Sequence, residues 1–258
     1  MLKIGVCGAA GRMGSRIIAL AQNNPELCVV AGVERKELQK NCPNNIKLSD
    51  NLSDVVELCD IIIDFTAPDV TLKNVALAKE KNKPIVIGTT GFDAQKLQII
   101  ANASKGIPVL LSPNMSLGVN LLFKLSAIAA KALKGYDIEI VELHHNQKKD
   151  APSGTAAKLA EIMALALDRD IAKVGVYGRE GIVGARTKEE IGVMAVRAGD
   201  IVGEHTVYLA GTGERIELTH RAYSRDILAS GALTAAKWLS KQSSGLYSMQ
   251  DVLSLNKL

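Results

Sequence analysis

The sequence predicts an α/β protein with two domains, a doubly wound parallel sheet and an α+β domain with an open mixed sheet. Over the first 116 residues, short apolar runs alternate with helical segments, as in a parallel sheet covered on both faces. After residue 116 the pattern changes to long helices and longer alternating strands separated by glycine turns. The 258 residues are enough for two such domains with real cores.

The elements of the first domain follow from local patterns. Strands are expected where short β-branched runs end in turn residues, and helices where apolar residues recur at helical spacing. The expected strands with their closing turns are residues 2–7, 28–34, 60–66, 84–91 and 107–116. The expected helices are residues 15–24, 68–81 and 92–104, whereas the polar residues 35–51 contain no clear element.

The second domain begins near residue 116, and its elements also follow from local patterns. We expect helices at 118–133 and 155–167, a strand at 137–145, and strands at 191–199, 205–211 and 215–224. Thr212-Gly213-Glu214 between the last two strands predicts a tight hairpin turn. A terminal helix, apolar on one side, is expected over 226–242.

Composition excludes several classes of protein. Hydrophobic residues make up 47% and charged residues 22%, as in ordinary globular proteins. Aromatic residues are only 3% and the net charge of +4 forms no basic stripe, so we expect no nucleic-acid partner. The four cysteines form no C-x-x-C pair and have no histidine nearby, which predicts reduced thiols and no metal. No signal peptide and no membrane-length apolar run is visible, so we expect a cytoplasmic protein with no membrane partner.

A glycine loop joins the first strand to the first helix. Gly8, Gly11 and Gly14 have the spacing G-x-x-G-x-x-G, and Ala10 stands where the dinucleotide fingerprint has its second glycine. Backbone N–H groups at a helix start still favour a phosphate, and Arg12 adds a cation. The loop therefore predicts a Rossmann-like dinucleotide site, although glycines chosen for strand–helix packing alone would give the same spacing.

The end of the second strand supports the dinucleotide interpretation. Glu34 lies 20 residues after Gly14, where an acid accepts hydrogen bonds from ribose hydroxyls. Arg35 follows and can pair with a 2′-phosphate. The pair predicts that both NADH and NADPH fit.

Two further turns lie at strand ends, where a doubly wound sheet binds ligands. They are Gly88–Gly91 and Ser112–Met115. Glycine, threonine, proline and asparagine are also ordinary turn residues, so ligand binding and simple turn chemistry both remain open for them.

The segment 142–156 gathers proton carriers. His144 and His145 end a predicted strand and are expected to point to opposite faces, and Lys148 follows. Ser153-Gly154-Thr155 then begins a helix whose N–H groups can hold a carboxylate, while Asp150 can orient a neighbouring cation. We interpret the segment as a site for an anionic molecule that receives a proton. A capped helix after a polar loop is the alternative.

These motifs together resemble the 4-hydroxy-tetrahydrodipicolinate reductase family, also called dihydrodipicolinate reductases. The resemblance covers nearly the whole chain and is carried by GAAGRMG, GTTG, SPNMSLGVN and, most specifically, ELHHNQKKDAPSGTA. It implies NADH- or NADPH-dependent reduction of a small cyclic dicarboxylate in diaminopimelate and lysine synthesis. It also implies a homotetramer, with domains at 1–115 plus 226–258 for the dinucleotide and 116–225 for substrate and tetramerisation.

The resemblance also implies roles for individual residues. His144 would act as acid/base and Lys148 as proton donor, with His145, Gly154 and Thr155 binding substrate. The expected cofactor contacts are Gly8, Ala9, Ala10, Gly11, Arg12, Met13, Glu34, Arg35, Gly88, Thr89, Thr90, Ser112, Pro113, Asn114 and Met115. Ala10 departs from a glycine often seen in the loop, and Ser112, Pro113 and Met115 lie where the family varies.

Two other functions compete with this interpretation. Another two-domain NAD(P)-dependent dehydrogenase would share the first domain, but it would not need segment 142–156. A non-catalytic NAD(H)-binding redox sensor would need no paired histidines with a lysine, and we find no DNA-binding motif in the sequence.

Overall fold

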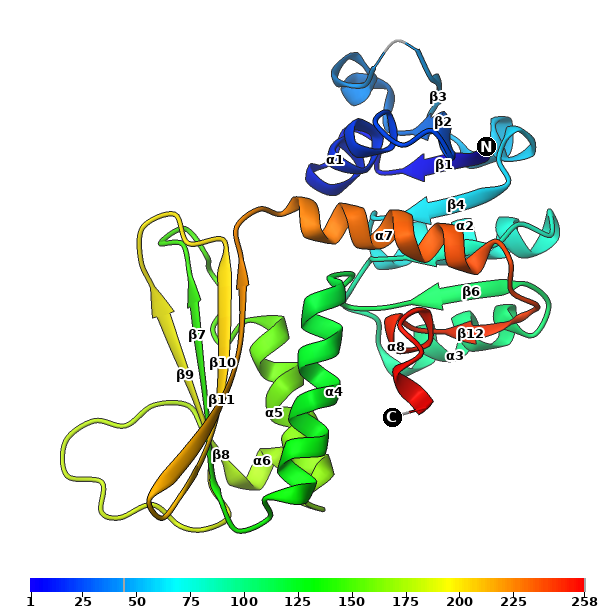
Figure 1. Cartoon of the computed structure of the whole chain (residues 1–258). Coiled ribbons are helices and arrows are strands. Elements are labelled where there is room, and N and C mark those ends of the chain that lie inside the picture. The colour runs from blue at the N-terminus through cyan, green and yellow to red at the C-terminus, as the bar shows by residue number, and fades with distance from the viewer. Residues whose placement is uncertain (44, 258) are drawn as a thin grey trace. The chain divides into compact units, whose positions relative to one another are not determined.

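The computed structural model describes residues 1–43 and 45–257. The chain divides into two compact units, whose helices and strands are shown in Figure 1. The first unit consists of Met1–Leu117 and Asp226–Leu258, and the second of Gly118–Arg225. The first unit is therefore built from both ends of the chain, and the second from one continuous segment.

A seven-stranded parallel sheet forms the centre of the first unit, in the order β12-β6-β5-β4-β1-β2-β3. The strands are β1 (Leu2–Cys7), β2 (Leu27–Val33), β3 (Lys47–Ser49), β4 (Ile61–Asp64), β5 (Ile85–Ile87), β6 (Pro108–Leu111) and β12 (Gly245–Tyr247). Central strands such as β4 are buried on both faces, which explains their unbroken apolar runs. This is the doubly wound sheet that the sequence predicts.

Helices cover both faces of this sheet (Figure 1). On one face, α1 (Arg12–Ala21) and α7 (Asp226–Leu239) share a core with Ile4, Val6 and Leu110. On the other, α2 (Pro68–Glu80) and α3 (Ala94–Ser104) pack on Ile62, Ile85 and Val109. The short elements are 3₁₀ turns at Lys36–Asn41, Leu52–Asp54, Val56–Leu58 and Leu255–Lys257, and helix α8 (Met249–Val252).

The second unit contains a five-stranded sheet in the order β11-β10-β7-β9-β8. Its strands are β7 (Asp137–His144), β8 (Gly175–Val176), β9 (Ile191–Arg197), β10 (Gly203–Gly211) and β11 (Glu214–Ala222), and its helices are α4 (Leu117–Ala132), α5 (Gly154–Ala166) and α6 (Ile171–Val174). β10 pairs antiparallel with β7 and β11, whereas β9 pairs parallel with β7 and β8. The sheet is therefore mixed, as expected.

Strand alternation in β7 decides which side chains reach the core. Ile138, Ile140, Glu142 and His144 are buried, and their neighbours in the strand are only half-buried. Ile138 and Ile140 join a core with α4 and α5, so Glu142 and His144 continue the same buried row toward the strand end. A carboxylate and an imidazole on a buried row require polar partners.

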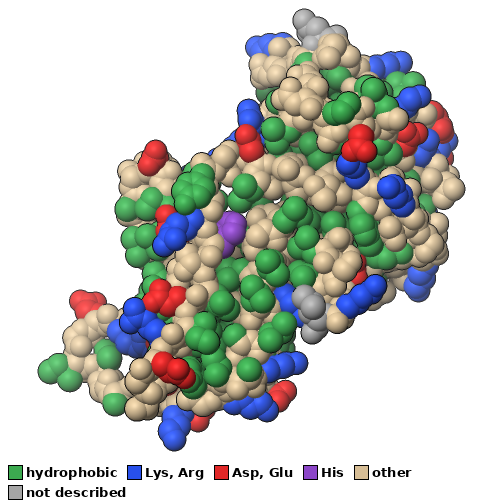
Figure 2. Space-filling model, in the orientation of Figure 1, with side chains coloured by type: hydrophobic (Ala, Val, Ile, Leu, Met, Phe, Trp, Pro, Cys, Tyr) green, Lys and Arg blue, Asp and Glu red, His purple; other side chains and the backbone are tan. Residues whose placement is uncertain are grey.

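Helix α4 keeps part of its apolar surface in solvent. Leu121, Leu125 and Ile128, spaced along one side of the helix, are 40–42% exposed. Hydrophobic side chains are visible on this face of the molecule (Figure 2). Among the described residues, no helix is both long enough and apolar enough to span a membrane.

Several short edge elements differ from the sequence prediction. Residues 35–51, expected to lack an element, contain the 3₁₀ turn Lys36–Asn41 and strand β3, and β8 and β12 were not predicted. These strands have only two or three residues, too few to show a periodicity. The hairpin turn uses Thr212 and Gly213 alone, because Glu214 already pairs with Gly211 in the ladder. Gly213 has φ = 84°, as such two-residue turns require.

Candidate active site

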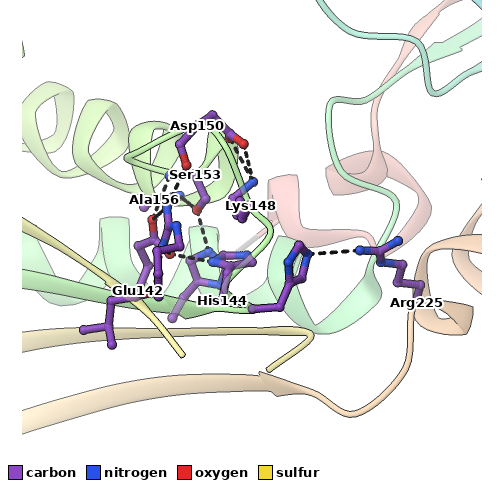
Figure 3. A network of polar contacts seen from close by, with 11 residues as sticks. Glu142, His144, Lys148, Asp150, Ser153, Ala156 and Arg225 are labelled. Atoms are coloured by element: carbon purple, nitrogen blue, oxygen red, sulfur yellow. Dashed lines mark hydrogen bonds and ion pairs between the residues drawn. The ribbon is translucent and has the colours of Figure 1, made fainter. Parts of the chain in front are cut away.

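A buried polar network surrounds His144 at the end of β7 (Figure 3). Nδ1 of His144 lies 2.5 Å from Oε2 of Glu142, two residues earlier on the strand. Arg197, at the end of the neighbouring strand β9, donates from both Nη atoms to the two Glu142 oxygens at 2.9 and 2.8 Å. The backbone N–H of Ser153 donates to Oε1 at 3.0 Å. Glu142 therefore accepts from four donors and needs no water.

The charges in this network follow from burial and these hydrogen bonds. Burial acts to raise the pKa of Glu142, but the hydrogen bonds from Arg197, His144 and Ser153 outweigh it and lower the pKa. Burial lowers the pKa of His144 despite the opposing effect of Glu142. At neutral pH the pair is thus a carboxylate and a neutral imidazole. Because an ionised carboxylate only accepts, Nδ1 carries the hydrogen and Nε2 carries the lone pair.

A second buried imidazole lies beside the first. His205 on β10 packs edge-on against His144 with ring centroids 5.2 Å apart, and its Nε2 lies 2.9 Å from Oγ of Ser153. Burial lowers the pKa of His205 to about 3, and the neighbouring His144 contributes to the shift. His205 is therefore neutral, and it fixes Ser153 and the His144 ring in place.

The loop after β7 carries the cations that the sequence places there. Both carboxylate oxygens of Asp150 lie 2.8 Å from Nζ of Lys148, so Asp150 orients the predicted proton donor. The hydrogen bond from Lys148 is the largest of the influences on Asp150 and lowers the pKa of its carboxyl group, so the group stays ionised. Nε2 of His145 accepts from Arg225 at 3.1 Å, so the two adjacent histidines have different partners (Figure 3).

Helix α5 begins where the sequence predicts an anion-holding helix start. Ser153 is its N-cap, with Oγ accepting from the N–H of Ala156 at 3.2 Å. Gly154 and Thr155 are the first two helical residues, and a Cβ on Gly154 would meet nothing within 4 Å. The positive end of the helix dipole and open space at Gly154 therefore lie together at this end of the helix.

Four residues of this network were missed by the sequence analysis, namely Glu142, Arg197, His205 and Arg225. Strand alternation already places Glu142 on the side of His144, and that signal was available. The other three come from 52 to 80 residues further along the chain than their partners, so no local pattern shows them.

The glycine loop of the first unit has the close backbone packing that a dinucleotide site needs. A Cβ on Gly14 would lie 2.1 Å from the carbonyl oxygen of Gly8, and Gly8 itself has φ = 81°. Only glycine allows this approach. Ala10 directs its N–H to Oε2 of Glu34 at 3.1 Å, so the acid at the end of β2 reaches the loop. The methyl group of Ala10 is partly buried and packs against the core of the first unit.

Two cavities open on either side of this loop and share Gly11, Phe65 and Thr66. The first, of about 380 Å³, is lined by Arg12 and Met13 of the loop and by most residues of the two predicted turns, namely Gly88, Thr89, Thr90, Ser112, Pro113, Asn114 and Met115. The second, of about 430 Å³, is lined by Gly8, Ala10, Glu34 and Arg35 among others. Both volumes suit small-ligand sites, and two joined halves suit a dinucleotide. Ala9 lines neither cavity, because its side chain is buried in the core under the loop.

A buried carboxylate holds the turns of the first cavity together. Asp64, at the end of β4, accepts from the hydroxyls of Thr66, Thr71 and Thr89 at 2.7, 3.0 and 3.2 Å and from Asn74 at 2.7 Å. These donors come from the strand end, from α2 and from the turn after β5. The network therefore fixes the predicted Gly88–Gly91 turn.

The four cysteines are free, and Cys28 alone is only half-buried. Among the described residues, no group of three or more histidine, cysteine or acidic side chains is arranged to hold a metal.

A dinucleotide loop and proton-carrying side chains on one chain are what a nicotinamide-dependent reductase requires, and we assign the chain to that class of oxidoreductases. Comparison with known proteins gives the family. The chain belongs to the dihydrodipicolinate reductase family: the family model described as "Dihydrodipicolinate reductase, N-terminus" matches residues 2–115, and the model described as "Dihydrodipicolinate reductase, C-terminus" matches residues 118–253. The resemblance inferred from the motifs is therefore confirmed.

Individual relatives agree with this assignment. The chain is 51% identical over 267 residues to the 4-hydroxy-tetrahydrodipicolinate reductase of Trichlorobacter lovleyi and 52% identical to that of Geobacter metallireducens, covering 99% of this chain and 100% of each relative. The solved structure of a dipicolinate-bound dihydrodipicolinate reductase from Paenisporosarcina sp. TG-14 has a TM-score of 0.82 at 26% identity, covering 97% of this chain and 98% of that one. A probable dehydrogenase from Thermotoga maritima, with a TM-score of 0.64 at 11% identity, shares the fold alone.

Proposed function

We propose that the chain reduces 4-hydroxy-tetrahydrodipicolinate to tetrahydrodipicolinate with NADH or NADPH, a step of diaminopimelate and lysine synthesis. The observation that carries the proposal is the neutral imidazole of His144, fixed by Glu142, on the loop that also presents Lys148. In the overall change the substrate first loses water, as a carbon–oxygen bond and a C–H bond on the neighbouring carbon break and a C=C bond forms. One hydride and one proton then add across that double bond. A nicotinamide dinucleotide supplies the hydride when bound.

The second unit supplies the proton and holds the substrate. The Lys148 ammonium donates a proton to the carbon next to the one that receives hydride. Neutral His144, with its lone pair on Nε2, serves as the acid/base that receives and returns a proton. Gly154 and Thr155 at the start of α5 hold one substrate carboxylate, and His145 contributes to substrate binding. Arg225, which is hydrogen-bonded to His145, adds positive charge for a dianionic ligand.

The first unit binds the cofactor in the two cavities beside the glycine loop. Gly8 through Met13 approach the pyrophosphate, and Glu34 accepts from ribose hydroxyls. Arg35, largely exposed, is available for a 2′-phosphate. The turns Gly88–Thr90 and Ser112–Met115 line the half of the site for the nicotinamide ring. We assign these two roles to the domains inferred from the sequence. Residues 1–115 with 226–258 bind the cofactor, and residues 116–225 bind the substrate.

Steady-state kinetics with matched variants test the proposal. Purified protein is mixed with NADPH and freshly generated substrate, and the loss of reduced cofactor is followed by absorbance. Lys148→Ala and His144→Gln should each lower kcat by about 10²-fold or more, because positioned proton transfer contributes at least that much. Lys149→Ala, the exposed neighbouring lysine, is the control and should leave kcat unchanged. Wild-type protein that binds NADPH without turnover would instead identify a non-catalytic sensor.

Inhibition tests the substrate class. A planar dicarboxylate such as dipicolinate, the ligand of the Paenisporosarcina relative, should compete with substrate. The monocarboxylate analogue should inhibit much more weakly, because it offers only one anion to Lys148, His145 and the α5 start. Equal inhibition by the two compounds would argue against the proposed substrate site.

We also propose a homotetramer that assembles through the second-unit sheet. Val141, Leu143, Met194 and Val196 lie side by side on the face opposite to the buried row of β7, and none of them is buried. An uncovered apolar strand face of this kind favours association. Sedimentation equilibrium should give four chains per particle, and Val196→Lys should dissociate it.

We place the enzyme in the cytoplasm, which immunoblotting of cell fractions tests.

A further inference from the structure

We propose that Glu142 is a positioning residue whose carboxylate, held by Arg197, sets the tautomer of His144 so that Nε2 presents a lone pair to the reaction. This inference deepens the proposed function, because it assumes that His144 takes part in proton transfer. Its structural content, the position of one hydrogen on one imidazole ring, is measurable without any turnover.

The two oxygens of Glu142 have different partners. Oε1 accepts from Nη2 of Arg197 at 2.8 Å and from the N–H of Ser153 at 3.0 Å. Oε2 accepts from Nη1 of Arg197 at 2.9 Å and lies 2.5 Å from Nδ1 of His144. Arginine and the backbone N–H are donors without alternative roles. They fix the carboxylate as the acceptor, so Oε2 can only accept the hydrogen on Nδ1 of His144.

The opposite nitrogen of the ring is kept available. Among the described residues, the His144 side chain forms its one hydrogen bond through Nδ1, to Glu142, and none through Nε2. Gly203 lies beside Nε2, and the absence of a side chain there leaves the nitrogen accessible. The geometry thus binds one nitrogen and exposes the other, as expected for an imidazole that acts through Nε2.

Arg197 also connects the Glu142–His144 pair to Lys148, the proposed proton donor. Its Nη2 donates to the carbonyl oxygen of Asp150 at 2.6 Å, and the Asp150 side chain holds Lys148. The charged or titratable groups facing the dyad are Arg197 from β9, His205 from β10 and Lys148 from the loop. Arg197 and Lys148 are cations and favour an ionised Glu142 beside a neutral His144, and neutral His205 adds no opposing charge.

Replacing Glu142 by its amide gives a sharp prediction. In Glu142→Gln the single amide oxygen is drawn to the Oε1 position, where Ser153 and Arg197 both donate. The amide NH₂ group then faces Nδ1 and donates to it, which moves the imidazole hydrogen to Nε2. We expect kcat to fall by between about 10²- and 10⁴-fold, because the wrong tautomer cannot accept at Nε2. KM for the cofactor should not change, since Glu142 lines neither cavity.

The matched control lies on the same strand. Glu139 is also a glutamate of β7 with a two-bond arginine partner, Arg179, at 2.9 and 3.1 Å, but it faces the opposite side of the sheet. Glu139→Gln removes an equivalent ion pair without touching His144. It should leave the His144 tautomer and kcat unchanged.

The decisive measurement is two-dimensional ¹H–¹⁵N NMR of protein labelled at histidine, which resolves both ring nitrogens. The chain has four histidines, and the His144→Gln variant assigns the relevant signal. Wild type and Glu139→Gln should show hydrogen on Nδ1 of His144, and Glu142→Gln should show it on Nε2. Hydrogen on Nε2 in wild type, or an unchanged tautomer in Glu142→Gln, would overturn the proposal.

If Glu142→Gln does not fold because Arg197 is left unpaired, Glu142→Gln combined with Arg197→Met removes both charges, which buried pairs commonly tolerate. Ser153 still orients the amide oxygen there, so the same tautomer reversal is expected and its absence overturns the proposal. If wild type shows no reductase activity, the proposed function fails, and the NMR result still decides whether Glu142 sets the tautomer of His144.

Discussion

Gly203 on β10 faces His144 on β7, and a Cβ built on Gly203 would lie 2.9 Å from Nε2 of the imidazole. This is closer than side-chain carbons normally approach a nitrogen, and the ring cannot simply turn away because Nδ1 is bound to Glu142. The glycine therefore belongs to the site although it contributes no side chain to it. Because Gly203 has no side chain, Nε2 of His144 remains accessible.

Gly203→Ala is expected to lower kcat by about tenfold or more, because the new methyl group displaces or covers Nε2 of the proposed acid/base. The folded state should lose about 1–3 kcal/mol from overpacking. Gly135→Ala, in an open turn of the same unit with nothing near the added carbon, is the control. Kinetics and urea unfolding of both variants check this. A Gly203→Ala enzyme with wild-type kcat would mean that Nε2 is not used.

Gly14→Ala should weaken cofactor binding. Its Cβ would lie 2.1 Å from the Gly8 carbonyl oxygen, so the loop must open and its N–H groups leave their positions around the pyrophosphate. We expect Kd for NADPH to rise by about tenfold or more and stability to fall by about 1–3 kcal/mol. Gly106→Ala, where the added carbon meets only ordinary contacts at 3.5 Å, should change neither. Fluorescence titration and thermal unfolding measure both quantities.

Arg35→Ala should separate the two cofactors. The Arg35 side chain is 74% exposed and its ion-pair partner Glu37 lies 3.6 Å away, so the guanidinium is available to a 2′-phosphate. We expect KM for NADPH to rise by about 10- to 100-fold, the equivalent of one charge-assisted hydrogen bond, while KM for NADH stays constant. Lys36→Ala is the neighbouring control. An equal rise for both cofactors would place Arg35 at the pyrophosphate, and no rise for either would place it outside the site.

His205 should make the folded state sensitive to acid. Its pKa is lowered from 6.5 to about 3 by burial, so between these values the unfolded chain binds a proton that the folded chain does not. Stability therefore falls as the pH drops below about 6.5, and the loss between pH 7 and pH 5 from this group is about 2 kcal/mol. In His205→Gln this part of the loss should disappear. Urea unfolding at both pH values compares the two proteins, and an identical pH dependence would contradict the shift.

Local signals in the sequence predicted much of the first unit and the centre of the site. The strand–glycine–helix start, Glu34 and the two turns are recognisable because each motif is complete within a few residues. His144, Lys148 and Ser153-Gly154-Thr155 lie within twelve residues, and the structure does give Lys148 a carboxylate partner from the same loop. Their catalytic and binding roles stay predictions until the variants are measured.

The parts that could not be predicted depend on contacts between distant segments. Arg197 reaches Glu142 across 55 residues, and Ser153 reaches His205 across 52. Only the pairing of β7 with β9 and β10 brings them together, and pairing partners are not visible in a single strand. β12 was missed for a related reason: three residues near the C-terminus gain their strand conformation from β6, far earlier in the chain.

The use of both chain ends in the first unit has a consequence for biosynthesis. Its core includes Ala232, Ala236 and Leu239 of α7, and its sheet ends in β12, so the fold cannot close until the final segment is available. The continuous segment 118–225 has no such requirement. On the ribosome, residues 118–225 can therefore reach their native structure first, while the first unit cannot complete its core and sheet until residues 226–247 have been translated.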